Sequence, residues 1–328
     1  MDHSCSYRYS IKNPDLRNTG YIVAIANIED KHDRSTPSHY HWKILKCRMI
    51  IFSNSSILAC PDKEDVKKVH IVFNKVGDDY DKLNSLFIKF SLRQDGAIRS
   101  TTPEIFKMCF TYTMTAKIAP TWNVLGFDYL VNNRDFLTTN GIQEGVKYQI
   151  VSDEFHTDLT LKPVNINIIK ATEDIAPGEY VRVLPSLNKA VVEECSKTLP
   201  EIGSFKSYKD IRRHWKNIHG YRLPDDETSY YMIRFWRGEP LTYPDICVTR
   251  HFPIITPMPR PREEIVLSRF VSCLKSKIPH FLGIPMTIKI KETMELIKVA
   301  DGRTPVPQTQ DHPISLCTPT QNLRQFKY

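Results

Sequence analysis

The sequence is poor in glycine and has none of the glycine-rich loops that hold phosphate groups. Its 328 residues include 12 thinly spread glycines, and neither GxGxxG nor GxxxxGKS/T occurs. The nucleophile elbow GxSxG, the zinc motif HExxH and the kinase motifs HRD and DFG are also missing. The familiar signatures of dinucleotide binding, serine hydrolysis, metalloprotease activity and protein phosphorylation are therefore excluded.

Close cysteine pairs and long apolar runs are lacking as well. No two of the eight cysteines lie within four residues of each other, which excludes zinc ribbons and redox-active CxxC motifs. No apolar run approaches 18 residues, and the polar start does not resemble a signal peptide. We therefore expect an intracellular protein, nuclear or cytoplasmic, with reduced cysteines and no membrane insertion.

Positive charge is concentrated in the last third of the chain. The net charge is +8, and residues 201–300 hold 17 lysines and arginines against 11 acidic residues, whereas the first 200 residues are close to neutral. We therefore expect an electrostatic partner to meet mainly the last third.

The clearest helix in the sequence is expected over Ser207–His219. Ser207 can cap its start, and Gly220 and Pro224 can end it. The apolar residues recur at steps of three and four, as one face of a helix requires: Tyr208, Ile211, Trp215 and Ile218.

The opposite face of this helix is basic. It carries Lys209, Arg212, Arg213 and Lys216. Such a face can bind phosphates, acidic proteins or anionic lipid, or it can simply be a solvated surface that keeps the protein soluble.

Other segments predict a mixture of helices and strands. Thr102-Pro103-Glu104 and Pro261-Arg262-Glu263-Glu264 are typical helix starts. Residues 40–52 favour a helix, and residues 123–130 are interpreted as another. Strands are predicted over 69–74, 85–96, 147–153, 161–173 and 229–238, with loop character near 185–200.

Some acidic and histidine groups could carry chemistry. Asp78, Asp79 and Asp81 could bind a divalent cation, although beside Gly77 a solvated turn is the simpler interpretation. His39 and His41 would not share one side of a helix. His214 and His219 could pair with Cys195 or Cys247 as a Cys–His nucleophile, but the sequence gives no sign that they are close. We predict no catalytic residue, metal site or cofactor.

Trp236 lies between Arg234 and Arg237 on a predicted strand. An aromatic ring between cations can stack on a nucleobase while the cations hold phosphate. The alternative is a half-exposed strand on which Ile233 and Phe235 alternate with outward-facing side chains.

Several stretches resemble an uncharacterised animal family whose vertebrate member is named chromosome 18 open reading frame 63. The residues that carry the resemblance are Arg213-His214-Trp215, Gly220-Tyr221-Arg222-Leu223-Pro224, Thr242-Tyr243-Pro244 and Leu274-Lys275-Ser276-Lys277-Ile278-Pro279-His280, with Gly283 and Pro285. The resemblance implies a natural folded domain and brings no catalytic residues, cofactor or substrate.

These observations predict an α+β fold with mixed, mainly antiparallel sheets and three to four covering helices. We expect two abutting lobes, residues 1–160 and residues 161–300 with the basic helix, followed by a flexible tail over 301–328. The leading hypothesis is a non-enzymatic interaction module or scaffold that binds an acidic protein surface or nucleic acid. The alternative is an enzyme whose acidic or histidine site the sequence does not reveal. The oligomeric state stays open.

Overall fold

A computed structural model describes residues 5–26, 39–169, 175–200, 205–236 and 239–295. These residues belong to one compact unit, and the fold is α+β with mainly antiparallel sheets, as predicted. The expected tail over 301–328 lies outside the described residues.

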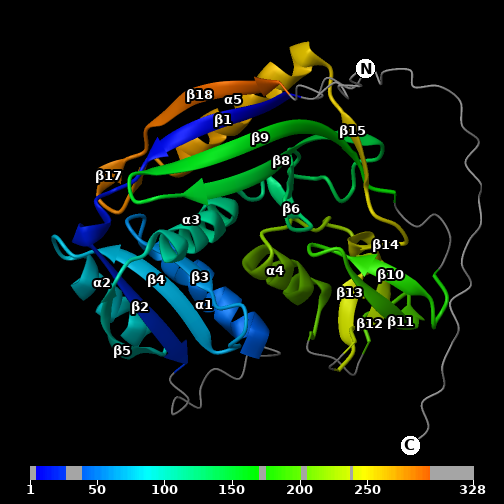
Figure 1. Ribbon diagram of the computed structural model, residues 1–328. Coiled ribbons are helices and arrows are strands. Elements are labelled where there is room, and N and C mark those ends of the chain that lie inside the picture. Colours follow the sequence, from blue (N-terminus) through cyan, green and yellow to red (C-terminus); the bar gives the residue numbers. More distant parts are fainter. Residues whose placement is uncertain (1–4, 27–38, 170–174, 201–204, 237–238, 296–328) are drawn as a thin grey trace, which may run out of the picture. The chain divides into compact units, whose positions relative to one another are not determined.

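The largest sheet has seven strands, and its strand pairs are antiparallel. The strand order is β18–β1–β9–β8–β7–β6, and β15 also pairs with β9 (Figure 1). Buried and outward-facing residues alternate along much of β9, as a sheet with one buried face requires. The strands are β1 (Cys5–Lys12), β6 (Asn123–Leu125), β7 (Tyr129–Val131), β8 (Ile142–Ser152), β9 (His156–Asn167), β15 (Ile254–Pro257) and β18 (Ile288–Glu295).

Two smaller antiparallel sheets and a short hairpin complete the strands in the described ranges. A four-stranded sheet has the order β3–β4–β2–β5, and a five-stranded sheet has the order β13–β12–β11–β10–β14. The first consists of β2 (Thr19–Ala26), β3 (Leu58–Pro61), β4 (Lys68–Asn74) and β5 (Leu92–Ser100). The second consists of β10 (Tyr180–Val183), β11 (Asn188–Ser196), β12 (Tyr230–Arg234), β13 (Leu241–Pro244) and β14 (Val248–Thr249), and the hairpin is β16 (His280–Phe281) with β17 (Ile284–Pro285).

The described part of the chain contains five α-helices. Thr102 caps the third, where its hydroxyl accepts a hydrogen bond from the Ile105 backbone N–H at 3.4 Å, and Pro103 begins the first turn. The helices are α1 (His39–Ser53), α2 (Asp79–Lys89), α3 (Pro103–Ile118), α4 (Tyr208–Ile218) and α5 (Arg260–Lys277), with short 3₁₀ turns η1 (Leu16–Asn18) and η2 (Asp245–Cys247).

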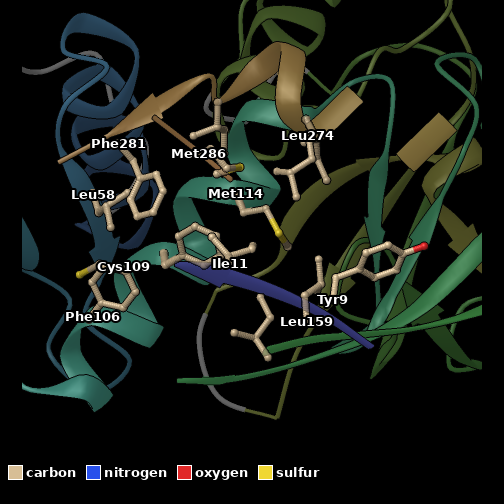
Figure 2. Close-up of a cluster of buried hydrophobic side chains, with 14 of the residues drawn as sticks. Tyr9, Ile11, Leu58, Phe106, Cys109, Met114, Leu159, Leu274, Phe281 and Met286 are labelled. Carbon is tan, nitrogen blue, oxygen red and sulfur yellow. The ribbon is translucent and has the colours of Figure 1, made fainter. Parts of the chain in front are cut away.

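The largest group of buried side chains lies between the seven-stranded sheet and helices α3 and α5. Figure 2 shows Phe106 and Met114 of α3, Leu274 of α5, Ile11 of β1 and Leu159 of β9 meeting in it. A second group joins the four-stranded sheet to α1 and α2. A third joins α4 to strands of both the seven-stranded and the five-stranded sheets, so α4 is held from two sides.

Three local predictions were wrong. Residues 123–130 form the β6–β7 hairpin rather than a helix, because Gly126 takes a left-handed turn with φ of 64° and the flanking residues pair. The first half of the strand predicted over 85–96 belongs to α2, whose Leu83 and Phe87 lie buried one turn apart. The expected loop near 185–200 contains β11.

The two-lobe division stays a prediction. In the structure, residue 160 lies inside β9, which pairs with β1 and β8 from the first proposed lobe and with β15 from the second. The seven-stranded sheet therefore takes strands from both proposed lobes.

Candidate anion-binding pocket

Helix α4 has the two faces that its sequence predicts. Ser207 caps it by accepting a hydrogen bond from the Asp210 backbone N–H at 3.3 Å. Ile211, Trp215 and Ile218 are buried. Gly220 follows with φ of 79°, the left-handed conformation expected of a helix terminator. The basic face is thereby turned away from the core.

This basic face borders a pocket of about 990 Å³. Helices α1 and α4 are in contact, and the pocket is lined by their side chains together with the turn after α3, the segment after β7 and the segment after α4. Its volume is at the upper end of the usual range for ligand pockets, roughly 300–1,000 Å³.

The pocket lining carries seven cationic side chains and no carboxylate. The cations are Arg48, Arg134, Lys209, Arg212, Arg213, Lys216 and Arg222. Three of them form ion pairs with acids that do not line the pocket. Arg212 contacts Asp225, Arg213 lies 3.7 Å from Asp210, and Arg222 lies 2.9 Å from Asp135 and 3.9 Å from Asp225. Cations that converge in a concave site raise the local concentration of anions.

Arg48 of α1 differs from the other cations because it is buried. Only 9% of its surface is exposed. Its guanidinium carbon lies 5.4 Å from the centre of the Phe52 ring, a cation–π contact one helical turn away. Within the described ranges, no ion pair joins Arg48 to a carboxylate.

Gly220 makes room for the Arg48 side chain. A Cβ at this position would lie 3.3 Å from one guanidinium nitrogen of Arg48 and 2.7 Å from the Cβ of Ala119. Because of its positive φ and this close approach, position 220 favours glycine.

Comparison with known proteins places the chain in a family. A family model described as a domain of unknown function, DUF4708, matches residues 6–175 and 164–257, which is more than half of the chain. The chain belongs to the DUF4708 family. A solved structure of the Argonaute protein from Methanocaldcoccus janaschii is similar to this DUF4708 chain at 10% identity and a TM-score of 0.28. The match covers 78% of this chain and 34% of the Argonaute chain. At this level of similarity it says nothing about function.

A cluster of three histidines lies where α1 and α4 of the DUF4708 chain meet. The ring centres of His41 and His214 are 4.6 Å apart, and those of His214 and His219 are 6.1 Å apart. Burial lowers the pKa of His41. Burial, with repulsion from His41, lowers the pKa of His214 to about 3. Burial lowers the pKa of His219 too, with further repulsion from His214, His41 and Arg48. All three rings are therefore neutral at pH 7.

Among the residues that the structure describes, no group of three or more His, Cys, Asp and Glu side chains is arranged to hold a metal ion. Asp78 lies 2.7 Å from Lys82, and Asp79 and Asp81 form the first turn of α2, where negative charge is favourable. The acidic cluster is thus part of a helix start.

The two candidate thiols are in different environments. Cys195 donates to the carbonyl oxygen of Ile175 at 2.8 Å, and burial raises the pKa of the Cys247 thiol. Burial and the nearby negative charge of Asp245 favour the thiol over the nucleophilic thiolate at Cys247.

The structure unites some of the basic residues singled out in the sequence and separates others. Lys209, Arg212, Arg213 and Lys216 line the same pocket. Arg234 and Trp236 are not part of this lining: Arg234 lies 2.6 Å from Glu193, and the Trp236 side chain is 94% exposed. Arg237 lies outside the described residues.

Three of the pocket cations were not predicted from the sequence as binding residues: Arg48, Arg134 and Arg222. They come from segments far apart in the chain. Arg48 belongs to a segment expected to be helical, but nothing in the sequence places that helix beside α4.

Within the described ranges, no helix is long and apolar enough to cross a membrane.

Proposed function

We propose that this chain is a non-enzymatic interaction module that binds nucleic acid through the basic pocket between α1 and α4. The observation that carries the proposal is the lining of seven cationic side chains with no carboxylate among them. Lysine and arginine contacts with phosphate supply most of the affinity of nonspecific nucleic-acid binding.

The shape of the site favours nucleic acid over an acidic protein surface. Stable protein interfaces bury a broad area, about 800 Å² on each partner. Here the cations converge on a concave pocket, and five of the seven are arginines with forked guanidinium groups that match phosphate oxygens. An acidic protein surface remains the competing ligand and is included in the test below.

We also propose that the protein functions inside the cell, in the nucleus or cytoplasm. The seven cysteines in the described part of the chain are free, and five of them are buried. Free thiols are typical of reducing compartments. We also propose that the chain is a member of the chromosome 18 open reading frame 63 family, which the resemblance around Arg213-His214-Trp215 supports.

The alternative function is an enzyme with an acidic or histidine site. No specific observation favours it. Burial, together with repulsion between the rings, lowers the pKa values of His214 and His219, and the acidic cluster forms the start of α2.

The test is a titration with fluorescent single-stranded RNA at low and high salt. We expect affinity to fall steeply as salt rises, because binding releases counterions from the phosphates. The variant Lys209→Glu/Arg213→Glu/Lys216→Glu should lower the log–log salt slope by roughly two to three. Arg212 is left in place because its side chain is only 34% exposed and contacts Asp225, whereas Arg213 is 65% exposed and lies 3.7 Å from Asp210.

A matched control reverses three exposed lysines that do not line the pocket, Lys12, Lys63 and Lys289. It changes the net charge equally and should keep the wild-type affinity. Equal loss in both variants would show that binding follows net charge and not the pocket. Tighter binding of polyglutamate than of RNA would favour an acidic protein partner.

A further inference from the structure

The buried guanidinium of Arg48 has no carboxylate partner among the residues that the structure describes. The guanidinium group of arginine carries a positive charge. Removing a charge from water is expensive unless an opposite charge or several hydrogen bonds compensate it. In the described part of the chain, the Arg48 guanidinium lies against the Phe52 ring, which is a weaker partner than a carboxylate.

Neighbouring charges raise this cost. The nearby His219 is neutral because burial lowers its pKa, with smaller contributions from His214, His41 and Arg48, so the histidine cluster offers Arg48 no opposite charge. The pocket lining adds six further cations and no anion. The position thus suits a ligand that brings a negative group to Arg48.

The wall around Arg48 is apolar and partly aromatic. Leu45, Met49 and Phe52 project from the same face of α1, and Pro120 and Leu223 also line the pocket. The Phe52 side chain is 59% exposed although Arg48 lies against it. An exposed ring supported by a guanidinium is a surface on which a nucleobase can stack.

We propose that the pocket takes a single-stranded segment of nucleic acid, with one phosphate on Arg48 and a neighbouring base stacked on Phe52. This inference rests on the proposed function and specifies the form of the ligand. A duplex presents its phosphates on a stiff convex surface with its bases already stacked. A single strand can insert one phosphate into a pocket and turn an unstacked base toward an aromatic ring.

The first experiment compares Arg48→Met with Arg134→Met, which removes an exposed cation of the same pocket. The probe is a labelled single strand of about 12 nucleotides, within the usual site sizes of single-strand-binding folds. We expect Arg48→Met to weaken binding roughly 10- to 100-fold, as for loss of a charged hydrogen bond in a buried site. Arg134→Met should cost about fivefold or less. Equal losses would contradict the special role of Arg48.

The second measurement is the melting temperature without ligand. If Arg48 had a purely structural role, replacing it would lower this temperature. Because methionine removes an uncompensated buried charge, Arg48→Met should unfold about 2 °C or more above the wild type. Arg48→Lys keeps the charge but loses the fork, and should bind with intermediate affinity. A lower melting temperature for Arg48→Met would mean that Arg48 stabilises the fold, and would overturn the inference.

The third comparison tests the stacked base. Phe52→Ala should weaken binding to the single strand roughly 5- to 150-fold with an unchanged salt slope, because stacking is lost but no charge is removed. Phe127→Ala is the matched control, since Phe127 is 83% exposed and does not line the pocket. It should bind as the wild type does.

The strand requirement is tested with a duplex of the same sequence. We expect binding at least about tenfold weaker than for the single strand, since the duplex reaches neither Arg48 nor Phe52 and retains only the outer cations. If duplex and single strand bind equally and Arg48→Met has no effect, the inference fails while the proposed function stands. If neither is bound in a salt-dependent way, the proposed function fails as well.

Discussion

Replacing Trp215 with alanine tests the attachment of α4 to the rest of the protein. The Trp215 side chain is 2% exposed. Its ring centre lies 5.5 Å from that of Tyr243, in an edge-to-face arrangement, and 5.9 Å from that of Tyr221. These contacts tie α4 to the five-stranded sheet through Tyr243 and to the segment that follows the helix through Tyr221.

The expected cost of Trp215→Ala follows from this packing. Truncation of a buried tryptophan leaves a cavity and destabilises a protein by about 3–5 kcal/mol. The two aromatic contacts place the value toward the upper part of that range, since each contributes about 0.5–1.5 kcal/mol beyond its buried area. At roughly 2–4 °C per kcal/mol for a domain of this size, the melting temperature should fall by roughly 6–20 °C.

The assay is thermal unfolding followed by circular dichroism, with Trp236→Ala as the matched control. The control deletes the same atoms from a side chain that is 94% exposed, and it should leave the melting temperature unchanged. Affinity for RNA should also fall for Trp215→Ala, because α4 carries four of the seven pocket cations. Similar melting temperatures for the two variants would refute the assignment of Trp215 to the core.

Three further predictions concern the same region and the chain end. Because the folded-state pKa of His214 is lowered to about 3, the unfolded state binds a proton first as pH falls, and the free energy of unfolding should decrease between pH 6.5 and 3. In denaturant titrations, His214→Gln should make the free energy of unfolding less dependent on pH over this range. An unchanged pH dependence would contradict the burial of His214. Gly220→Ala should lower the melting temperature by several degrees, since alanine at φ of 79° is strained and its Cβ would lie 2.7 Å from that of Ala119; a neutral effect would mean that the turn can shift. Deleting residues 301–328, a segment poor in large apolar residues, should leave melting unchanged, and a marked loss would show that this segment packs.

Local sequence signals were sufficient for several elements. Ser207, the apolar residues at steps of three and four, and Gly220 together predicted α4 and its basic face, because each signal acts within a few residues. Thr102 and Pro103 predicted the start of α3 for the same reason. The sequence also predicted the α+β class with mainly antiparallel sheets.

Local signals misled where the same residues suit two structures. Residues 123–130 carry an apolar pattern that a helix would accept, but pairing of Val131 with Asn123 and of Tyr129 with Lys147 selects strands. The segment after Gly77 looked like a loop followed by a strand, because its helical pattern rests on two buried positions, Leu83 and Phe87. In both cases, contacts with other parts of the chain select the secondary structure, and the residue pattern of the segment itself does not reveal those contacts.

The candidate site, too, was predicted in part from the sequence and in part only by the tertiary structure. The sequence by itself determined that α4 has a basic face, because helical periodicity fixes which side chains share one side. Only the tertiary structure decided that this face closes a pocket with Arg48, Arg134 and Arg222, while Arg234 pairs with Glu193 elsewhere. The physical reason is that a pocket is made by packing: α1 and α4 are more than 150 residues apart in the chain, and their contact depends on buried surfaces, not on any property of either segment alone.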